Sequence, residues 1–532
     1  MIPAVMYVLL IAIALNPCAW SRSTRERKEK CSLGAHCSDI TEISKHSPVH
    51  CWHHSGSPKY SRYCTTKTKS NAAATLRALW QETVYSGIHA KKPHFNKSCV
   101  TLLGRRSALL FLALVADTKA RVMNYIKIAI PFFILLIAIE FIYGWLRKRN
   151  TYRINDTVGS LQMGVLSQSK GLLRLGISGL VFGYLVQALG VKQLPADSAL
   201  LWVVTFVVYD CLYYWKHRYG HQWRIMWASH SAHHQSEEYN LSTALRQTST
   251  DYIGFIFYLP LYLAGVPTEV IISVGSLNLI YQFWVHTEHV GRMGLLEWVL
   301  VTPSNHRVHH ARNPEYIDKN YGGFFIIWDR IFSTFKDEET ERPCVYGVTK
   351  QLGSFNPLWA NLYVWYDTFL ISLKTKKWSD KIKVWFKGPA WYPEDAQPLQ
   401  AADWQYPSFD PNISHFYKGY SFVQFWVITL VTLWLPSTQD IVSREFMLTV
   451  FFWCIFSLYV QSAFLEGRTY AKKLEGVRLG FLLLGVVLAS SVWPGLGPDM
   501  VSLASIYGAI SFGLCFLYEI FVREKSVATA TE

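Results

Sequence analysis

The chain has 532 residues, of which 51% are hydrophobic and only 17% are charged, and its formal net charge is +15. This composition argues against a set of ordinary soluble domains, because several apolar runs reach the about 20 residues that a membrane-spanning helix needs. The charge does not indicate nucleic-acid binding, since residues 1–122 carry a net +12 and leave only +3 for all the rest. The sequence therefore predicts a polytopic membrane protein.

Residues 1–122 differ in character from the rest of the chain. A short apolar run at 6–15 resembles a signal peptide but has no basic segment before it. This part of the chain would form a small disulfide framework if it were lumenal. The alternative, which we favour, is a disordered or mis-annotated extension, with the protein starting at Met123. Six of the ten cysteines lie in this part: Cys18, Cys31, Cys37, Cys51, Cys64 and Cys99.

From Met123 onwards, the apolar runs predict an all-α, polytopic bundle of membrane helices. They divide the chain into a catalytic domain at 123–340, a polar cytosolic region at 341–419, and C-terminal transmembrane helices at 420–532. Lys and Arg follow the first, third and last spans and precede the eighth, so the positive-inside rule places them on the cytosolic face. The expected spans are 126–146, 171–190, 199–215, 252–266, 269–285, 420–436, 444–463, 479–494 and 500–522.

Ten of the 18 histidines lie between His217 and His310, and nine of these form spaced motifs that the topology places on the same cytosolic face. The motifs are one His-x-x-x-His, two copies of His-x-x-His-His and a single histidine between those copies. Residues three and four positions apart share one face of a helix, so the imidazoles of each motif can converge. The candidate metal-binding and catalytic residues are His217, His221, His230, His233, His234, His286, His306, His309 and His310.

The number and type of these candidates favour two metal ions with open coordination positions. Structural zinc sites use about four ligands and often thiolates, whereas this region has nine imidazoles and no patterned cysteine. Imidazole binds iron, zinc, copper and nickel alike, so the ligand type alone does not choose the metal. Iron fits if the chemistry is oxygen activation, since zinc is not redox-active. A metal site at a membrane surface suits a lipid substrate whose polar head stays at the interface.

Four ionisable residues close to the motifs could each have either of two roles. Asp210 either orients an imidazole or lies at the membrane interface. His289 is either a ligand or an interfacial residue. Glu237 and Glu238 either contact a metal or cofactor or face solvent, and solvent is the default reading. Two charged residues within expected spans are candidates by position alone but lie far from the motifs in sequence: Glu140 and Arg174.

These motifs and their flanking residues resemble the fatty acid hydroxylase/sterol desaturase superfamily of membrane di-iron enzymes. Within it, the run EYNLSTALRQ at 238–247 is similar to the alkylglycerol monooxygenase family. Gln222 departs from that pattern where an acidic residue is expected, which puts a carboxylate role there in doubt, and Asn305 departs where a histidine is expected. The resemblance runs from Met123 to the C-terminus and is most specific at 209–335. Further similar stretches are 279–288, 302–310, 317–323, 327–332 and 386–391.

The resemblance implies a monooxygenase that uses tetrahydrobiopterin and cleaves the ether bond of alkylglycerols. The nine histidines would hold two iron ions, dioxygen would bind at the open positions, and the pterin would supply two electrons. Hydroxylation of the ether-linked carbon would give a hemiacetal, which collapses to a fatty aldehyde and glycerol or its derivative. The resemblance also implies a multi-pass protein of the endoplasmic reticulum membrane. No pterin-binding motif can be read from the sequence.

Two alternative functions remain open at this stage. The first is a sterol or fatty-acyl hydroxylase or desaturase of the same superfamily, which would use an electron-transfer protein instead of a pterin. The second is a metal transporter or sensor. Transport sites lie near the bilayer midplane on broken helices, whereas these motifs follow the ends of expected spans, which disfavours transport.

Overall fold

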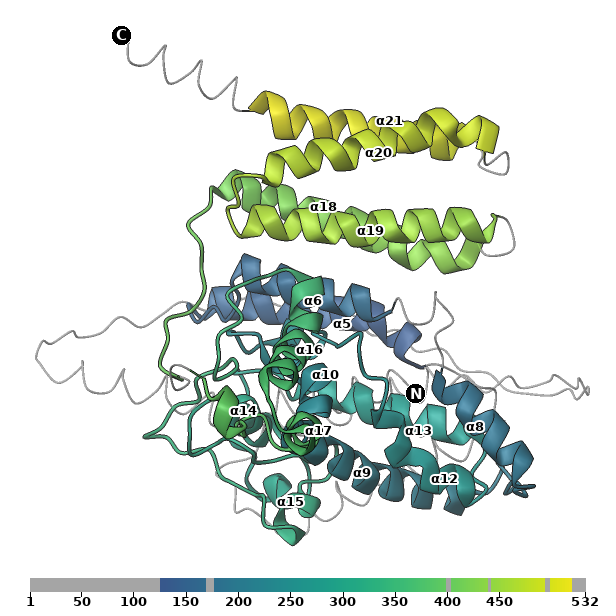
Figure 1. Cartoon of the computed structure of the whole chain (residues 1–532), viewed down its shortest axis with the longest axis vertical. Helices are drawn as coiled ribbons and strands as arrows, with labels where there is room; N and C mark the ends of the chain where they lie inside the picture. The colour runs from purple at the N-terminus through teal and green to yellow at the C-terminus, as the bar shows by residue number, and fades with distance from the viewer. Residues whose placement is uncertain (1–124, 169–176, 399–402, 439–441, 493–497, 519–532) are drawn as a thin grey trace, which may run out of the picture. The chain divides into compact units, whose positions relative to one another are not determined.

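The computed structural model describes residues 125–168, 177–398, 403–438, 442–492 and 498–518 (Figure 1). The regular secondary structure of these residues is helical, with two isolated β-bridges and no β-strand among them. The all-α membrane fold expected from the sequence is confirmed. The expectations for residues 1–122 and for Arg174 lie outside the described residues.

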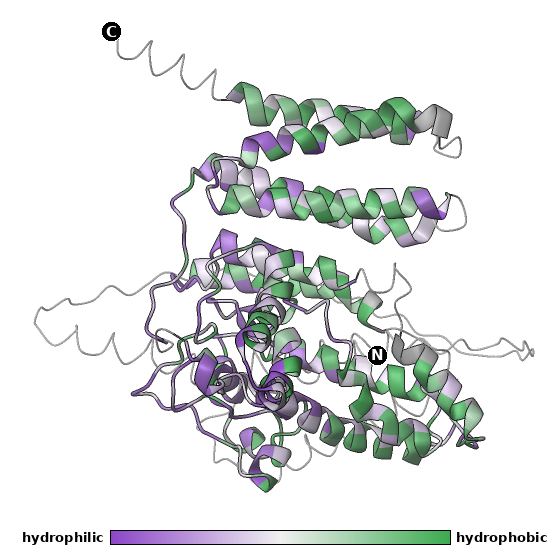
Figure 2. Ribbon diagram, in the orientation of Figure 1, coloured by the Kyte–Doolittle hydropathy of each residue, from purple (hydrophilic) through white to green (hydrophobic). Residues whose placement is uncertain are grey.

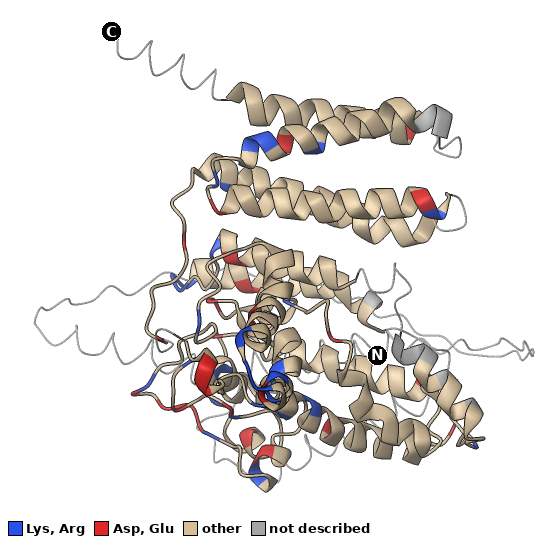
Figure 3. Ribbon diagram, viewed as in Figure 1, with Lys and Arg blue, Asp and Glu red and all other residues tan. Residues whose placement is uncertain are grey.

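Within the described residues, four helices are long and apolar enough to cross a bilayer. They coincide with the first, sixth, seventh and last expected spans, and hydrophobic residues cover most of their length (Figure 2). The charged residues of the C-terminal helices gather near helix ends (Figure 3). The four helices are α5 (Tyr125–Leu146), α18 (His415–Trp434), α19 (Arg444–Leu465) and α21 (Pro498–Phe512), the last continued by η5 (Gly513–Leu517).

The span expected at 252–266 is wrong. The chain there forms a 3₁₀ helix, η1 (Gly254–Tyr258), and a short helix, α12 (Leu259–Leu263). Together they reach under about 20 Å, too short for a hydrocarbon core of about 30 Å. Gly265 ends the segment with a φ of +80°, and a side chain there would clash with the Lys192 carbonyl. Helices lie at the remaining expected spans, but none of them is among the four long and apolar enough to cross a bilayer, so these spans stay predictions. They are α8 (Ile177–Ala188), α9 (Ala199–Gln222), α13 (Thr268–Trp284) and α20 (Ala471–Val492).

The described part of region 341–419, expected to be polar, includes α16 (Pro357–Lys374) and α17 (Trp378–Phe386), and α18 begins within it at His415. Helix α16 begins after Asn356, whose side chain caps the first turn by accepting hydrogen bonds from two backbone amides. Helix α16 packs against α10 (Arg224–His234), which carries the second histidine motif. This region is therefore part of the structure that surrounds the motifs.

Helix α6 (Ile154–Ser167) has no counterpart among the expected elements, because many of its buried residues are polar. It packs against α11 (Leu241–Ala244) and α16, and also against α18 and α19. Ser462 of α19 donates a 3.2 Å hydrogen bond to the Gln162 side chain. Helix α6 therefore joins the histidine-bearing part to the C-terminal helices.

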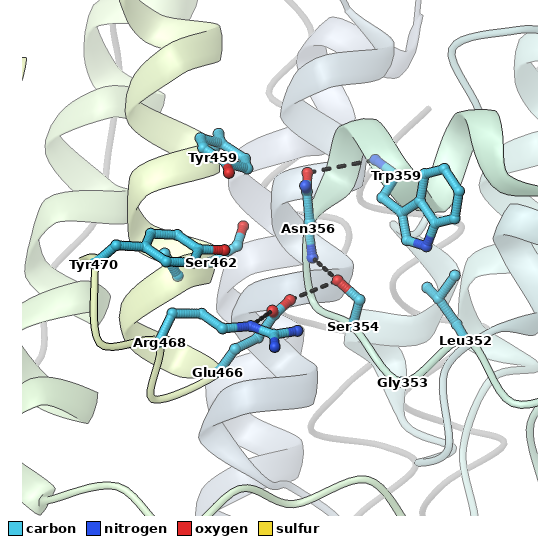
Figure 4. A pocket seen from close by; sticks show the side chains of 11 residues that line it. Leu352, Gly353, Ser354, Asn356, Trp359, Tyr459, Ser462, Glu466, Arg468 and Tyr470 are labelled. Carbon is cyan, nitrogen blue, oxygen red and sulfur yellow. Dashed lines mark hydrogen bonds and ion pairs between the residues drawn. The ribbon is translucent and has the colours of Figure 1, made fainter. Parts of the chain in front are cut away.

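The end of α19 is also fixed to the start of α16, through Glu466 (Figure 4). The Glu466 carboxylate accepts hydrogen bonds from the Ser354 hydroxyl at 2.5 Å and from the Phe355 amide at 2.8 Å. It also pairs with Arg468 at 2.7 Å. A pocket of about 240 Å³ lies beside these residues. The contact holds a membrane helix against a helix that borders the histidine motifs.

Candidate metal centre

The nine histidines singled out in the sequence lie together in two groups with metal-binding geometry. In each group, one side-chain nitrogen of every member lies within 4.8 Å of the others. The five-histidine group consists of His217, His221, His230, His234 and His309. The four-histidine group consists of His233, His286, His306 and His310. Their role as ligands stays a prediction, but the structure brings all nine together.

Each His-x-x-His-His motif contributes to both groups. His230 and His234 of α10 belong to the five-histidine group, while His233 belongs to the other. In α14 (Pro303–His310), the first and last histidines join the four-histidine group and the middle one joins the five-histidine group. Residues i+3 and i+4 of a helix point about 100° apart, which explains the division. The motifs therefore build two adjacent sites rather than one convergent site each.

Helix α14 starts with a capping box that accounts for Asn305. The Thr302 hydroxyl accepts a hydrogen bond from the Asn305 amide, and the Asn305 side chain accepts one from the Thr302 amide at 3.2 Å. Pro303 occupies the first turn, where its missing N–H costs nothing. Asn305, which stands where the resemblance expects a histidine, thus fixes the start of the helix that carries three of the nine histidines.

Four imidazoles have their orientation set by backbone carbonyls. A carbonyl only accepts, so the Nδ1 of each of these rings carries the proton and its Nε2 lone pair is free to bind a metal. The hydrogen bonds run from His217 to Tyr321 at 2.7 Å, from His309 to Lys319 at 3.0 Å, from His233 to Arg246 at 3.0 Å and from His286 to Gln282 at 2.8 Å.

The imidazole Nε2 atoms are better placed to bind metal ions than to form hydrogen bonds with one another. His233 and His286 both carry their proton on Nδ1, yet their Nε2 atoms face each other at 3.3 Å. Two lone pairs repel at that distance unless a cation lies between them. The Nε2 atoms of His221, His309 and His310 are buried and have no hydrogen-bond partner in the described part of the chain. An unpartnered buried nitrogen costs about 1–3 kcal/mol, so the arrangement favours bound metal.

Burial keeps these imidazoles in the neutral form that binds metal. It lowers the pKa of His233 to about 4 and the pKa of His234, His309 and His310 well below the ordinary value, and neighbouring imidazoles lower the last three further. A protonated ring would have to lose its proton before it could bind a metal. At neutral pH no such proton has to be displaced.

Two of the carbonyls that hold histidines belong to a single loop at 317–322. Asp318 and Asn320 in this loop adopt positive φ values of 61° and 54°. The Asp329 carboxylate anchors the loop by accepting hydrogen bonds from the amides of Tyr321 and Gly322, both at 2.7 Å. Sequence analysis did not assign this role to Asp329, although the residue lies within the similar stretch 327–332.

The structure corrects the reading of Asp210 as a partner of an imidazole. Its carboxylate accepts hydrogen bonds from the amides of Phe324 and Phe325 at 2.8 and 2.9 Å, and from the Trp328 side chain at 2.9 Å. It also accepts one from Asn278 at 2.7 Å. Among the described residues these partners include no histidine, so Asp210 fixes the chain that follows the 317–322 loop.

Glu237, Glu238 and His289 do not belong to either histidine group within the described chain. Glu237 accepts hydrogen bonds from Gln351 and from the Phe409 amide, and Glu238 pairs with Arg153. Both glutamates therefore bind other protein groups, which is neither the metal contact nor the solvent exposure that the sequence suggested. The His289 ring packs edge-on against Tyr143 with centroids 5.1 Å apart.

Glu140 of α5 lies close to the site despite its distance in sequence. Its buried carboxylate accepts hydrogen bonds from the hydroxyls of Tyr152 and Thr287 and, at 2.8 Å, from the Leu241 amide. Thr287 follows His286 directly, so Glu140 ties the first membrane helix to the segment carrying that histidine.

A cavity of about 730 Å³ opens beside both histidine groups. His221, His234 and His309 line it from the five-histidine group, and His310 lines it from the other. Much of the remaining wall comes from 347–403, including residues of α16. A ligand in this cavity could therefore contact both histidine groups and residues of 347–403.

Comparison with known proteins agrees with this geometry. The fatty acid hydroxylase family matches residues 202–334. Alkylglycerol monooxygenase from Danio rerio is 37% identical over 69% of this chain and 83% of its own length. The Homo sapiens enzyme of that name is 39% identical over 58% of this chain and 70% of its own length. Mus musculus lathosterol oxidase is 29% identical over only 25% of this chain. No solved structure matches the chain significantly. The chain is therefore a membrane monooxygenase that belongs to the alkylglycerol monooxygenase family.

Proposed function

We propose that this protein is a di-iron, tetrahydrobiopterin-dependent enzyme that cleaves the ether bond of alkylglycerols. The observation that carries the proposal is the pair of adjacent histidine groups beside one cavity, in a member of this family. The sterol-directed alternative has less support, because the lathosterol oxidases match only a quarter of the chain.

The chain's own residues would perform binding and orientation. The five-histidine group and the four-histidine group would each hold one iron, and bound iron would supply the redox chemistry that activates dioxygen. The carbonyls of Lys319 and Tyr321 hold the Nε2 atoms of two of these histidines toward the metal position. The cavity would place the ether-linked carbon of the lipid beside both groups.

The overall reaction balances with one pterin per turnover. One oxygen atom of O₂ enters a C–H bond of the carbon attached to the ether oxygen, and a hemiacetal forms. The other oxygen atom leaves as water with two electrons and two protons from tetrahydrobiopterin. The hemiacetal then loses its hydroxyl proton as the C–O bond breaks, and the products are a fatty aldehyde and glycerol or its derivative.

We also propose the location and domain organisation that the sequence predicts. The protein would lie in the endoplasmic reticulum membrane with its histidines toward the cytosol. Residues 123–340 would form the catalytic domain, 341–419 a cytosolic region and 420–532 further membrane helices, while 1–122 would be an extension. The distribution of Lys and Arg around the expected spans supports this orientation.

The test is an aldehyde-release assay on membranes that contain the full chain. An alkylglycerol is supplied with oxygen, with and without tetrahydrobiopterin, and bound metal is measured in the same preparation. We expect aldehyde only when pterin is present, and two tightly held irons per chain. Turnover that ignores the pterin, or loosely held zinc in place of iron, would contradict the proposal.

A further inference from the structure

Arg312 lies in the wall of the cavity beside the histidine groups, two residues after the last histidine of α14. Only 5% of it is exposed. Its guanidinium lies on the face of the Tyr406 ring, 3.5 Å from the centroid, and its Nη2 donates a hydrogen bond to the Tyr406 carbonyl at 2.8 Å. The Arg312 amide donates to the Val345 carbonyl at 2.8 Å. The side chain is therefore fixed in place.

The guanidinium also lies near the Tyr406 hydroxyl, but two of its donor atoms make no hydrogen bond of good geometry. Arg312 Nε and Nη1 are both buried, and no hydrogen-bond partner for either occurs within the described ranges. A buried charged donor without a partner is costly in a protein interior. Its retention beside the metal centre indicates that a ligand supplies the missing acceptors.

The carboxylates around the cavity are already engaged with other groups. Asp318 lies 3.6 Å from His221, and Asp367 pairs with Lys350 at 3.4 Å. The third carboxylate of the wall, Asp403, accepts a hydrogen bond from the Gln405 amide. Glu237 lies off the wall and accepts hydrogen bonds from Gln351 and from the Phe409 amide. These acids therefore do not satisfy the open donors of Arg312.

A second buried guanidinium lines the same cavity. Arg224 is only 2% exposed, and its Nη2 donates to the carbonyls of Pro389 and Trp391 at 2.6 and 2.5 Å. Its Nε has no partner in the described structure, and the same holds for the buried Ser231 hydroxyl on the cavity wall. Guanidinium donors in a fixed plane recognise phosphate oxygens well, often with two hydrogen bonds at once.

We propose that Arg312, together with Arg224, binds the phosphate group of an ether lipid in this cavity, so that the enzyme prefers alkylglycerols carrying a phosphate over neutral ones. This inference rests on the proposed function in that it takes the cavity to be the lipid site. The phosphate would accept hydrogen bonds from Arg312 Nε and Nη1, and the alkyl ether would extend toward the histidine groups.

The test compares Arg312→Met with wild type on two lipids of equal chain length, a neutral 1-O-alkylglycerol and its 3-phosphate. We expect Arg312→Met to raise KM for the phosphate lipid at least about tenfold more than KM for the neutral lipid. An equal change for both lipids would show a structural role and overturn the proposal. A rise in the pterin KM alone would instead assign Arg312 to the pterin and would also overturn it.

Arg330 provides a matched control for this substitution. Its guanidinium also packs on aromatic rings, those of Trp298 and Phe335, and its Nε is also buried without a partner in the described chain. It is not part of the cavity wall. Arg330→Met should leave the KM ratio of the two lipids unchanged. A ratio altered as strongly as in Arg312→Met would show that loss of any such arginine has this effect.

A binding measurement separates failure of this inference from failure of the proposed function. We expect the phosphate lipid, added without pterin, to raise the thermal stability of the wild type but not of Arg312→Met. This result would uphold the phosphate site even if no pterin-dependent turnover were found. Equal stabilisation of both proteins would overturn it whatever the activity. Inorganic phosphate that stabilises the wild type as well as the lipid does would also overturn the assignment to a lipid.

Discussion

Two regions of the molecule bury polar side chains, and they differ in whether those side chains find hydrogen-bond partners within the protein. In the C-terminal helices, Arg478 and Glu475 of α20 are both 0% exposed, yet they pair closely at 2.5 and 2.8 Å. Arg478 also donates to the Tyr507 hydroxyl at 2.7 Å and to the Gln424 side chain at 3.0 Å. In the histidine region, by contrast, buried nitrogens of His221, His309 and His310 have no partner among the described residues.

This difference in hydrogen bonding distinguishes buried polar groups that serve helix packing from buried polar groups that are available to bind a ligand. The network around Arg478 joins α18, α20 and α21 and satisfies its charges within the protein, so it can hold apolar helices in one arrangement. The histidine region leaves lone pairs facing one another and open donors on a cavity wall. The unpartnered histidine nitrogens and arginine donors lie beside one cavity, where a bound metal or ligand could satisfy them.

Removing a single ligand should give the largest effect in the molecule. His233→Ala deletes one of four imidazoles from the four-histidine group, and we expect turnover to fall below detection and bound iron to fall by about half. His289→Ala is the control, because this histidine lies outside both groups. Iron content and aldehyde release measured in the same membranes check the prediction, and near-full turnover of His233→Ala would contradict it.

Breaking the closed network should harm stability rather than chemistry. Arg478→Met leaves the Glu475 carboxylate buried without its main partner, and such changes cost about 3–5 kcal/mol. Replacing both residues by apolar ones of similar size should cost much less. Unfolding in detergent measures the difference, and iron per folded chain should not change. A double variant as unstable as the single one would show that the pair does not act as a unit.

A smaller effect is expected where the histidine groups are held by a loop. Asp329→Asn should loosen the segment whose carbonyls orient His217 and His309, since an amide side chain cannot accept all the hydrogen bonds of the carboxylate. Loss of such a supporting partner weakens metal binding about 10–100-fold. Competition with a chelator measures this change, and the exposed Asp337→Asn is the control. Equal iron retention in the two variants would exclude the anchoring role.

The sequence could predict that the histidines of one motif lie on a shared helix face, because this depends only on their local spacing. His230 and His234 are one helical turn apart whatever the rest of the chain does, so their shared face follows from the sequence. The assignment of His233 to the other group could not be predicted, because it depends on where α13 and α14 lie around α10. The same holds for Glu140, which approaches His286 only after folding brings α5 beside α13.

The membrane helices show a similar limit. Runs such as 444–463 are mostly apolar and predict a crossing helix by composition alone. The run at 252–266 has the same composition but contains Pro260 and ends at Gly265, whose positive φ turns the chain before a full crossing. Helix α6 escaped prediction for the opposite reason, because its buried face pairs polar groups such as Gln162 with polar groups of other helices.

A difference in pH response between the two regions is also expected. Burial lowers the pKa of His233 from its ordinary value of 6.5 to about 4, so below pH 6.5 the unfolded chain binds a proton that the folded chain does not. Protonation then favours the unfolded state, and the metal-free protein should lose stability as the pH falls from 6.5 toward 4. Each such histidine contributes at most about 1.4 kcal/mol per pH unit.

Amide exchange of the chelator-treated protein locates this effect. Exchange in α10 and α14 should quicken as the pH is lowered through this window, after correction for the intrinsic exchange rate, while exchange in α18–α20 should not. Bound iron should suppress the change, because a ligated nitrogen is not free to take up a proton. A uniform change along the chain would mean that the two regions unfold together and that the histidines do not set a separate acid sensitivity.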